Sequence, residues 1–142
     1  MTTRLAVIDT NVVVSGLLTA NADAPTARIL DAMVAGTIRF VLSADLLAEY
    51  RQVLLRPRVR RLHGLSEGEI DEVLTEIVQA ALVLEPTSGT GSPARSGDAH
   101  IRALVVTRPD LVLVTGDRAL ARSLAKHVAV LSPAEFAAGW AR

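Results

Sequence analysis

Short apolar runs alternate with amphipathic segments along almost the whole chain. The apolar runs occupy residues 5–8, 38–42, 82–84, 111–114 and 128–130, and polar or turn residues bound each of them. Such runs are typical of strands that are buried on both faces. Because the segments between them have apolar residues at helical spacing, the pattern predicts a parallel sheet covered by helices on both sides.

The expected helices begin and end at residues that favour such boundaries. Ser43 caps a helix through Leu55 that Pro57 ends, and the capping box Ser66-Glu67-Gly68-Glu69 opens another helix. Residues 86–97 are rich in glycine, proline and serine, which predicts a loop. The predicted helices cover residues 11–18, 24–35, 43–55, 66–81, 98–107, 118–126 and the segment from 132 onward.

Composition narrows the classes of protein to which the chain can belong. Its 142 residues are 50% hydrophobic, so we expect a single domain over residues 1–142 with its own core. The 15 basic residues balance the 15 acidic ones, and aromatic residues make up 3%, which argues against a nucleic-acid-coating polycation and against a base-stacking platform. The absence of cysteine excludes disulfides and thiolate chemistry. We find no secretory signal and no apolar stretch that could cross a bilayer, so we expect a cytoplasmic protein with no membrane partner.

Four carboxylates stand where a parallel sheet can bring them together. Asp9 directly follows the first predicted strand and Asp117 directly follows the fourth, so adjacent strands can place both acids at one edge of the sheet. Glu49 lies about one and a half turns into the helix after the second strand, and Asp98 opens a helix after the loop. All four side chains can therefore face one pocket.

Each acid also has a purely structural explanation. Asp98 and Asp117 stand where helix N-caps are expected, and Glu49 can be a solvated helix residue. Asp9 is the hardest to explain in this way, because a charged residue ends a buried apolar strand. Carboxylates that share a pocket raise one another's pKa, and a divalent cation relieves this repulsion. Since the donors are oxygens, the expected ion is Mg²⁺ or Mn²⁺, which can support phosphodiester hydrolysis.

Two sequence segments resemble the motifs of a known nuclease family. Asp9-Thr10-Asn11-Val12-Val13-Val14-Ser15-Gly16 is similar to the opening motif of PIN domains, and Thr115-Gly116-Asp117-Arg118-Ala119-Leu120 is similar to their late strand-to-helix motif. Between them, Glu49 and Asp98 occupy the places of the second and third family acids. The resemblance extends from Leu5 to about Phe136. The chain departs from many relatives by having Arg95-Ser96-Gly97 before Asp98 and His100 after it, which leaves the number of bound ions open.

The resemblance implies a three-layer α/β/α fold with a central parallel sheet of four or five strands. It also implies cleavage of single-stranded RNA assisted by Mg²⁺ or Mn²⁺, with Asp9, Glu49, Asp98 and Asp117 as the catalytic, metal-binding residues. Small VapC-like members of the family are often toxins of toxin–antitoxin pairs. The implied partners are therefore RNA, an antitoxin protein and a second copy of the chain.

Two other functions remain open at this point. Asp9 and Gly116-Asp117 also fit a small phosphatase of the haloacid-dehalogenase type, although Asn11 stands where that family has a second aspartate. A catalytically degenerate PIN scaffold that only binds partners is the second alternative. Arg118 directly follows Asp117, so it can take part in the candidate site. His100 is expected on the surface of a helix. The arginines at 51, 56, 58, 60 and 61 can either contact RNA phosphates or balance the acidic run at 67–76, and we slightly favour the second.

Overall fold

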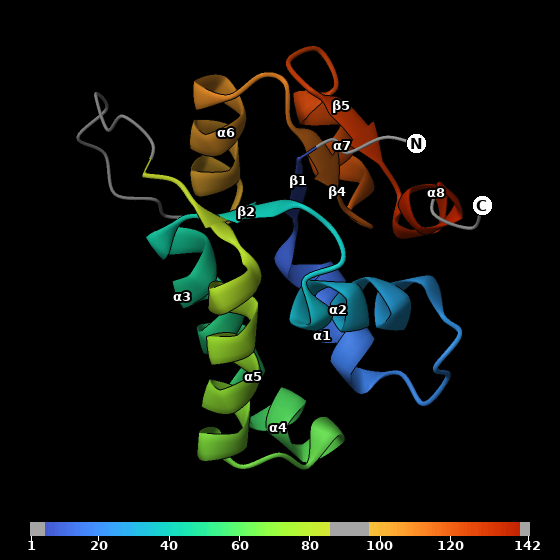
Figure 1. Cartoon of the computed structure of the whole chain (residues 1–142), viewed down its shortest axis with the longest axis vertical. Helices are drawn as coiled ribbons and strands as arrows, with labels where there is room; N and C mark the ends of the chain where they lie inside the picture. Colours follow the sequence, from blue (N-terminus) through green and yellow to red (C-terminus); the bar gives the residue numbers. More distant parts are fainter. Residues whose placement is uncertain (1–4, 86–96, 140–142) are drawn as a thin grey trace.

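The computed structural model describes residues 5–85 and 97–139, except for the side chain of Asp98. The predicted loop over 86–97 therefore lies, apart from Gly97, outside the described residues. The described part is an α/β structure in three layers, with a parallel sheet between helices (Figure 1). The predicted fold class is confirmed.

Five parallel strands form the sheet, in the order β3-β2-β1-β4-β5. The central strand β1 (Ala6–Ile8) pairs with β2 (Phe40–Leu42) on one side and with β4 (Val112–Val114) on the other. The edge strands are β3 (Leu82–Val83) and β5 (Ala129–Leu131). Every residue of the three central strands is buried, which explains why their sequences are continuous apolar runs.

The helices connect successive strands and pack over the sheet (Figure 1). Contacts join α1 to α2 and α3, and α3 to α5 and α6. None of the helices within the described ranges combines the length and the hydropathy that crossing a bilayer requires. The helices are α1 (Thr10–Leu18), α2 (Pro25–Ala35), α3 (Ala44–Leu54), α4 (Pro57–His63), α5 (Glu67–Ala80), α6 (Gly97–Thr107), α7 (Arg118–Leu124) and α8 (Pro133–Ala138).

One helix, α4, is absent from the sequence-based expectation. Pro57 follows the end of α3, as predicted, but it also begins α4, where a proline loses no helical hydrogen bond. Gly64 then ends α4 in the left-handed conformation at φ 70°, which glycine adopts without steric strain. The same proline thus ends one helix and starts the next.

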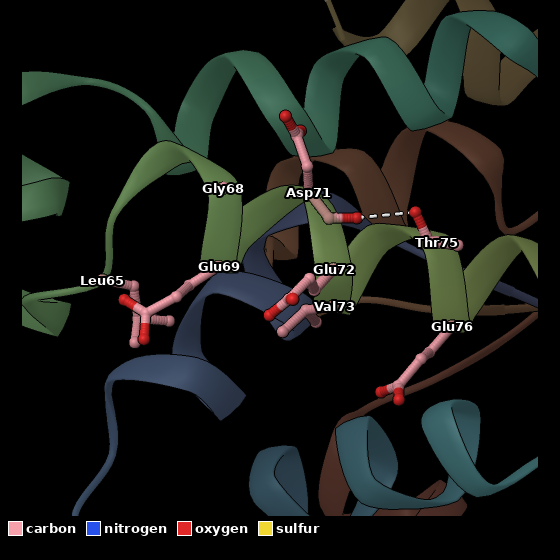
Figure 2. A pocket seen from close by; sticks show the side chains of 8 residues that line it. All are labelled: Leu65, Gly68, Glu69, Asp71, Glu72, Val73, Thr75 and Glu76. Atoms are coloured by element: carbon pink, nitrogen blue, oxygen red, sulfur yellow. Dashed lines mark hydrogen bonds between the residues drawn. The ribbon is translucent and has the colours of Figure 1, made fainter.

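Helix α5 begins at the predicted capping box and presents an acidic outer surface. Ser66 Oγ accepts a hydrogen bond from the Glu69 amide at 3.1 Å, and the Glu69 side chain accepts one from the Ser66 amide at 2.9 Å. A hollow of about 710 Å³ runs along this helix, and residues lining it include Asp71 and Glu76 (Figure 2). Because the carboxylates of Asp71 and Glu76 point in opposite directions in Figure 2, this hollow does not gather them around one point.

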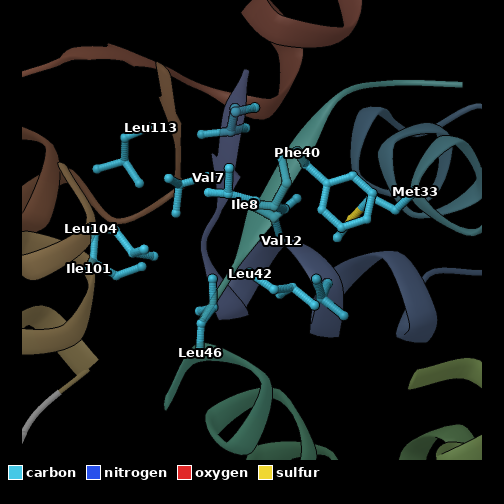
Figure 3. Close-up of a cluster of buried hydrophobic side chains, with 14 of the residues drawn as sticks. Val7, Ile8, Val12, Met33, Phe40, Leu42, Leu46, Ile101, Leu104 and Leu113 are labelled. Atoms are coloured by element: carbon cyan, nitrogen blue, oxygen red, sulfur yellow. The ribbon is translucent and has the colours of Figure 1, made fainter. Parts of the chain in front are cut away.

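The hydrophobic core lies on both sides of the three central strands. Figure 3 shows Val7 and Ile8 of β1 among side chains from α1, α2, α3 and α6. Tyr50 is the largest fully buried side chain of the described residues, and its hydroxyl donates a hydrogen bond to the Ile8 carbonyl at the end of β1. This contact ties α3 to the strand that carries Asp9, so the core itself sets the distance between the two elements.

Gly16 lets α1 approach α2 closely. A Cβ atom at this position would lie 2.5 Å from the Thr26 carbonyl oxygen, which is backbone and has little freedom to move. We therefore expect Gly16→Ala to lower the free energy of unfolding by about 1–3 kcal/mol in urea denaturation, even though alanine favours helix. The matched control is Gly68→Ala in α5, where the nearest atom is 3.9 Å away. Equal stabilisation by both substitutions would contradict the close packing of α1 on α2.

Candidate active site

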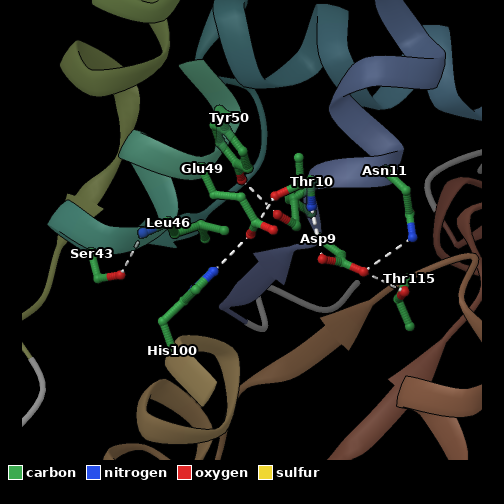
Figure 4. Close-up of polar contacts among 10 residues, drawn as sticks. Asp9, Thr10, Asn11, Ser43, Leu46, Glu49, Tyr50, His100 and Thr115 are labelled. Carbon is green, nitrogen blue, oxygen red and sulfur yellow. Dashed lines mark hydrogen bonds and ion pairs between the residues drawn. The ribbon is translucent and has the colours of Figure 1, made fainter. Parts of the chain in front are cut away.

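Asp9 stands at the end of the central strand, with both carboxylate oxygens held by neighbours (Figure 4). Oδ1 accepts a hydrogen bond from the Thr10 amide at 2.8 Å, so Asp9 also caps α1. Oδ2 accepts hydrogen bonds from Thr115 Oγ1 at 2.7 Å and from Asn11 Nδ2 at 3.1 Å. The side chain is 8% exposed. These contacts fix the orientation of a carboxylate that is almost removed from solvent.

Glu49 reaches the same region from α3. Its Oε1 accepts a hydrogen bond from Thr10 Oγ1 at 2.8 Å and lies 2.6 Å from His100 Nε2 (Figure 4). Since an ionised carboxylate can only accept, His100 Nε2 is the donor in this contact. Glu49 Oε2 accepts no hydrogen bond from the residues that the structure describes, so its lone pairs remain available to a cation.

His100 is the site residue whose environment the sequence did not reveal. The prediction of a helix-surface histidine was wrong, because His100 is 7% exposed and points from α6 toward Glu49. Its Nδ1 atom is buried and has no hydrogen-bond partner among the residues that the structure describes. The spacing from Asp98 gives no signal for it, because residues two positions apart on a helix face different sides.

Asp117 follows β4 and caps α7 as the sequence predicts. Its Oδ1 accepts hydrogen bonds from the amides of Ala119 at 2.9 Å and Leu120 at 3.1 Å. The Asp117 amide donates to Thr115 Oγ1 at 3.0 Å, and that hydroxyl in turn donates to Asp9. Thr115 therefore links the two acids at the ends of the paired strands β1 and β4. The capping role and a role in a site are compatible, because Oδ2 accepts no hydrogen bond from the described residues.

Three of the four predicted acids line one pocket of about 390 Å³. Asp9 and Asp117 come from the ends of adjacent strands and Glu49 from α3, as their sequence positions suggest. Arg118, in contrast, is exposed and is not among the residues that line this pocket. The lining consists of Asp9, Thr10, Asn11, Val14, Ser15, Glu49, Val53, Arg56 and Asp117.

The fourth acid, Asp98, has its backbone in the first turn of α6, but its side chain lies outside the described residues. His100 lies two residues further along the same turn and contacts Glu49. The start of α6 is therefore near the site, while the role of the Asp98 carboxylate stays a prediction.

The electrostatics of the pocket disfavour negative charge on Asp9. Burial raises the pKa of the Asp9 carboxyl above its ordinary value, hydrogen bonds from Thr115 and Thr10 lower it, and the charges of Glu49 and Asp117 raise it further. Burial also raises the pKa of the Tyr50 phenol well above its ordinary value, and the charges of Asp9 and Glu49 add to this shift. Tyr50 consequently remains a hydrogen-bond donor. Among the described residues that line the pocket, Arg56 carries the one positive charge.

The donors present are those that a hard divalent cation prefers. All three carboxylates offer oxygen ligands, and neither Glu49 Oε2 nor Asp117 Oδ2 is occupied by a hydrogen bond from the described residues. Within the same residues, no group of three or more Asp, Glu or His side chains is close enough to form a finished metal site. The chemistry of the donors fits Mg²⁺ or Mn²⁺, with small side-chain adjustments or a further ligand needed to complete the coordination.

Comparison with known proteins agrees with this geometry. The model of the PIN domain family matches residues 5–119, a range that includes all four predicted acids. PIN domains are generally nucleases that use divalent metal ions. A search among curated proteins finds no matching relative. Since the family match extends over well more than half of the sequence and contains the acids at the ends of β1 and β4, this chain belongs to the PIN-domain family.

Proposed function

We propose that this protein is a Mg²⁺- or Mn²⁺-dependent endoribonuclease that hydrolyses phosphodiester bonds of single-stranded RNA. The observation that supports it most directly is the convergence of Asp9, Glu49 and Asp117 on one pocket from three separate segments. Burial raises the pKa of Asp9 most, and the charges of Glu49 and Asp117 raise it further, so a cation that offsets this charge would stabilise the ionised acids. Binding of a divalent ion would explain why three carboxylates lie around one pocket.

In this proposal Asp9, Glu49, Asp98 and Asp117 hold the cation, and their neighbours position them. A divalent ion bound there supplies Lewis acidity, which makes water a better nucleophile and offsets charge that builds up on a phosphate. Thr115 and Asn11 fix Asp9, whereas Thr10 and His100 hold one oxygen of Glu49 and leave the other for the ion. Such hydrogen-bonded support of the ligands is what preserves metal affinity in proteins.

A cleavage assay separates this function from the alternatives. Purified protein is mixed with end-labelled single-stranded RNA in Mn²⁺, in Mg²⁺ and in excess EDTA, and with a phosphate monoester as a second substrate. We expect internal RNA cleavage in the two metal ions and none in EDTA, with the monoester intact. Release of phosphate from the monoester without RNA cleavage would favour the phosphatase. Failure to bind Mn²⁺ in calorimetry would favour the degenerate scaffold.

We further propose that the protein is the toxin of a toxin–antitoxin pair, acts in the cytoplasm, forms a homodimer and is inhibited by a cognate antitoxin. The support for this is the resemblance of its motifs to small stand-alone toxins of the family. Induced expression in bacterial cells is then expected to stop growth, and coexpression of the adjacent gene product to restore it. Normal growth of cells that contain active, RNA-cleaving protein would argue against the toxin role.

A further inference from the structure

The region between α3 and α5 has a concentration of positive charge that the acid pocket does not explain. Arginines occupy positions 56, 58, 60 and 61, and no acidic residue lies between 50 and 66. All four arginines are exposed. We call these residues, Arg56, Arg58, Arg60 and Arg61, the α4 arginines. In a chain whose charges cancel overall, they form a local excess of positive charge.

The acidic run of α5 neutralises a different arginine. Arg51 Nε donates to Asp71 at 2.8 Å and Arg51 Nη2 contacts Glu67 at 2.6 Å. These contacts raise the pKa of Arg51 above its ordinary value, and they are the balance that the sequence predicts for the whole arginine cluster. For the α4 arginines the structure gives no ion pair within 4.0 Å to any acid of the described residues. Their charge is therefore free for a ligand.

The α4 arginines lie next to the acid pocket. Arg56 is itself part of the pocket lining, together with Asp9, Glu49 and Asp117. Helix α4 contacts both α1, which follows Asp9, and α3, which carries Glu49. Val53 of α3 and Ser15 of α1 line the same pocket. One wall thus leads from the three acids along these two helices to Arg56 and the start of α4.

We propose that the α4 arginines bind the phosphates of a single-stranded RNA that extends from the pocket, with Arg56 as the contact nearest to the reaction centre. This inference rests on the proposed nuclease function. Arginine suits the role because its planar fork donates two hydrogen bonds to one phosphate. The carboxylates of the pocket are already used to hold the proposed metal ion, so arginines beside the pocket are the side chains suited to bind the RNA phosphates further along the strand.

The salt dependence of RNA binding tests the proposal without turnover. The parent is the full chain with Asp9→Asn, and its affinity for a labelled single-stranded RNA is measured by fluorescence anisotropy over a range of salt concentrations. We expect Arg56→Gln to weaken binding by about three- to tenfold and to reduce the slope of log K against log salt by about 0.7, the value for one lost single-strand phosphate contact. We expect Arg56→Gln to weaken binding of single-stranded DNA of the same sequence by the same factor, because the arginine contacts phosphates rather than bases.

The matched control is Arg39→Gln. Arg39 is also exposed, but it precedes β2 and so lies at the opposite end of the sheet from the acids. Equal affinities and slopes for the Arg56→Gln and Arg39→Gln proteins would overturn the inference, even when wild-type protein cleaves RNA. A parent that binds no RNA, together with wild-type protein that cleaves none, would instead remove the proposed function and this inference with it. In the wild-type background, Arg56→Gln is expected to raise KM more than it lowers kcat, since it acts on binding.

Discussion

We expect Asp9→Asn to lower metal-dependent RNA cleavage by more than about a hundredfold while the protein stays folded. Loss of a supporting partner of a metal ligand typically costs 10- to 100-fold in affinity or activity, and loss of a ligand charge exceeds that. Asparagine has nearly the same volume as aspartate, and its carbonyl can still accept the hydrogen bond from the Thr10 amide. Cleavage rates in Mn²⁺ and circular dichroism spectra of both proteins measure the two effects.

The stability of the metal-free protein gives an independent check on Asp9. The folded-state pKa of this acid is raised, mainly by burial, so its stabilising contribution is full below the ordinary pKa and is lost as the pH rises through the folded value. As the pH rises from the ordinary pKa of an aspartate to the folded-state pKa of Asp9, the melting temperature of the metal-free wild-type protein should therefore fall more steeply than that of the Asp9→Asn variant. Addition of Mn²⁺ at neutral pH should stabilise the wild type and not the variant. Equal stabilisation by Mn²⁺, or unchanged cleavage by the variant, would contradict the assigned role.

We expect His100→Leu to weaken Mn²⁺ binding about 10- to 100-fold, which is the second-largest effect. The substitution removes one of the two donors to Glu49 Oε1 and leaves Thr10 alone to orient the carboxylate. It also removes a buried Nδ1 atom that has no partner in the described part of the chain, and therefore little loss of folding stability is expected. Calorimetric titration with Mn²⁺ and urea denaturation of the same samples distinguish a positioning role from a structural one.

Two further variants sharpen the His100 experiment. His100→Gln keeps an N–H donor on a side chain of suitable length and is expected to restore most of the Mn²⁺ affinity. His63 is the matched control, because both of its ring nitrogens contact backbone groups and not a carboxylate. Nε2 lies 2.9 Å from the Leu54 carbonyl, and Nδ1 accepts a hydrogen bond from the Leu65 amide at 2.9 Å. His63→Gln should change stability and leave Mn²⁺ affinity unchanged. Loss of affinity in all three variants would show that histidine packing, rather than the Glu49 contact, is responsible.

The sequence predicted the positions of those site residues that follow directly from the ends of strands. Asp9 and Asp117 follow β1 and β4, and these strands pair in parallel register, so both acids share one edge of the sheet. Glu49 was predictable because α3 starts at the end of β2, the neighbour of β1. His100 was not, since whether a helical residue is buried depends on which face of α6 packs inward. The sequence of α6 does not determine which of its faces packs inward; the packing of α6 on the sheet and on α3 does.

For the arginines, too, the sequence left two roles open and the structure distinguished them. Their sequence fits both an RNA contact and a balance for the acids of α5, and spacing alone cannot divide them. In the structure Arg51 pairs with Asp71 and Glu67, whereas Arg56 lines the acid pocket. Arg51 lies within α3 and faces the acids of α5, whereas Arg56 lies after the end of α3, at the N-cap of α4.

The sequence by itself determined the α/β class and the parallel sheet, because strands buried on both faces have continuous apolar sequences. It named four acids for one edge of this sheet, and three of them, Asp9, Glu49 and Asp117, line one pocket in the structure. Only the tertiary structure decided that His100 holds Glu49, that Thr115 joins Asp9 to Asp117, and that Arg56 rather than Arg118 borders the pocket. Those contacts join residues up to 106 positions apart in the chain. Local propensity acts over a few residues, so partners at such separations are chosen by how the helices pack on the sheet.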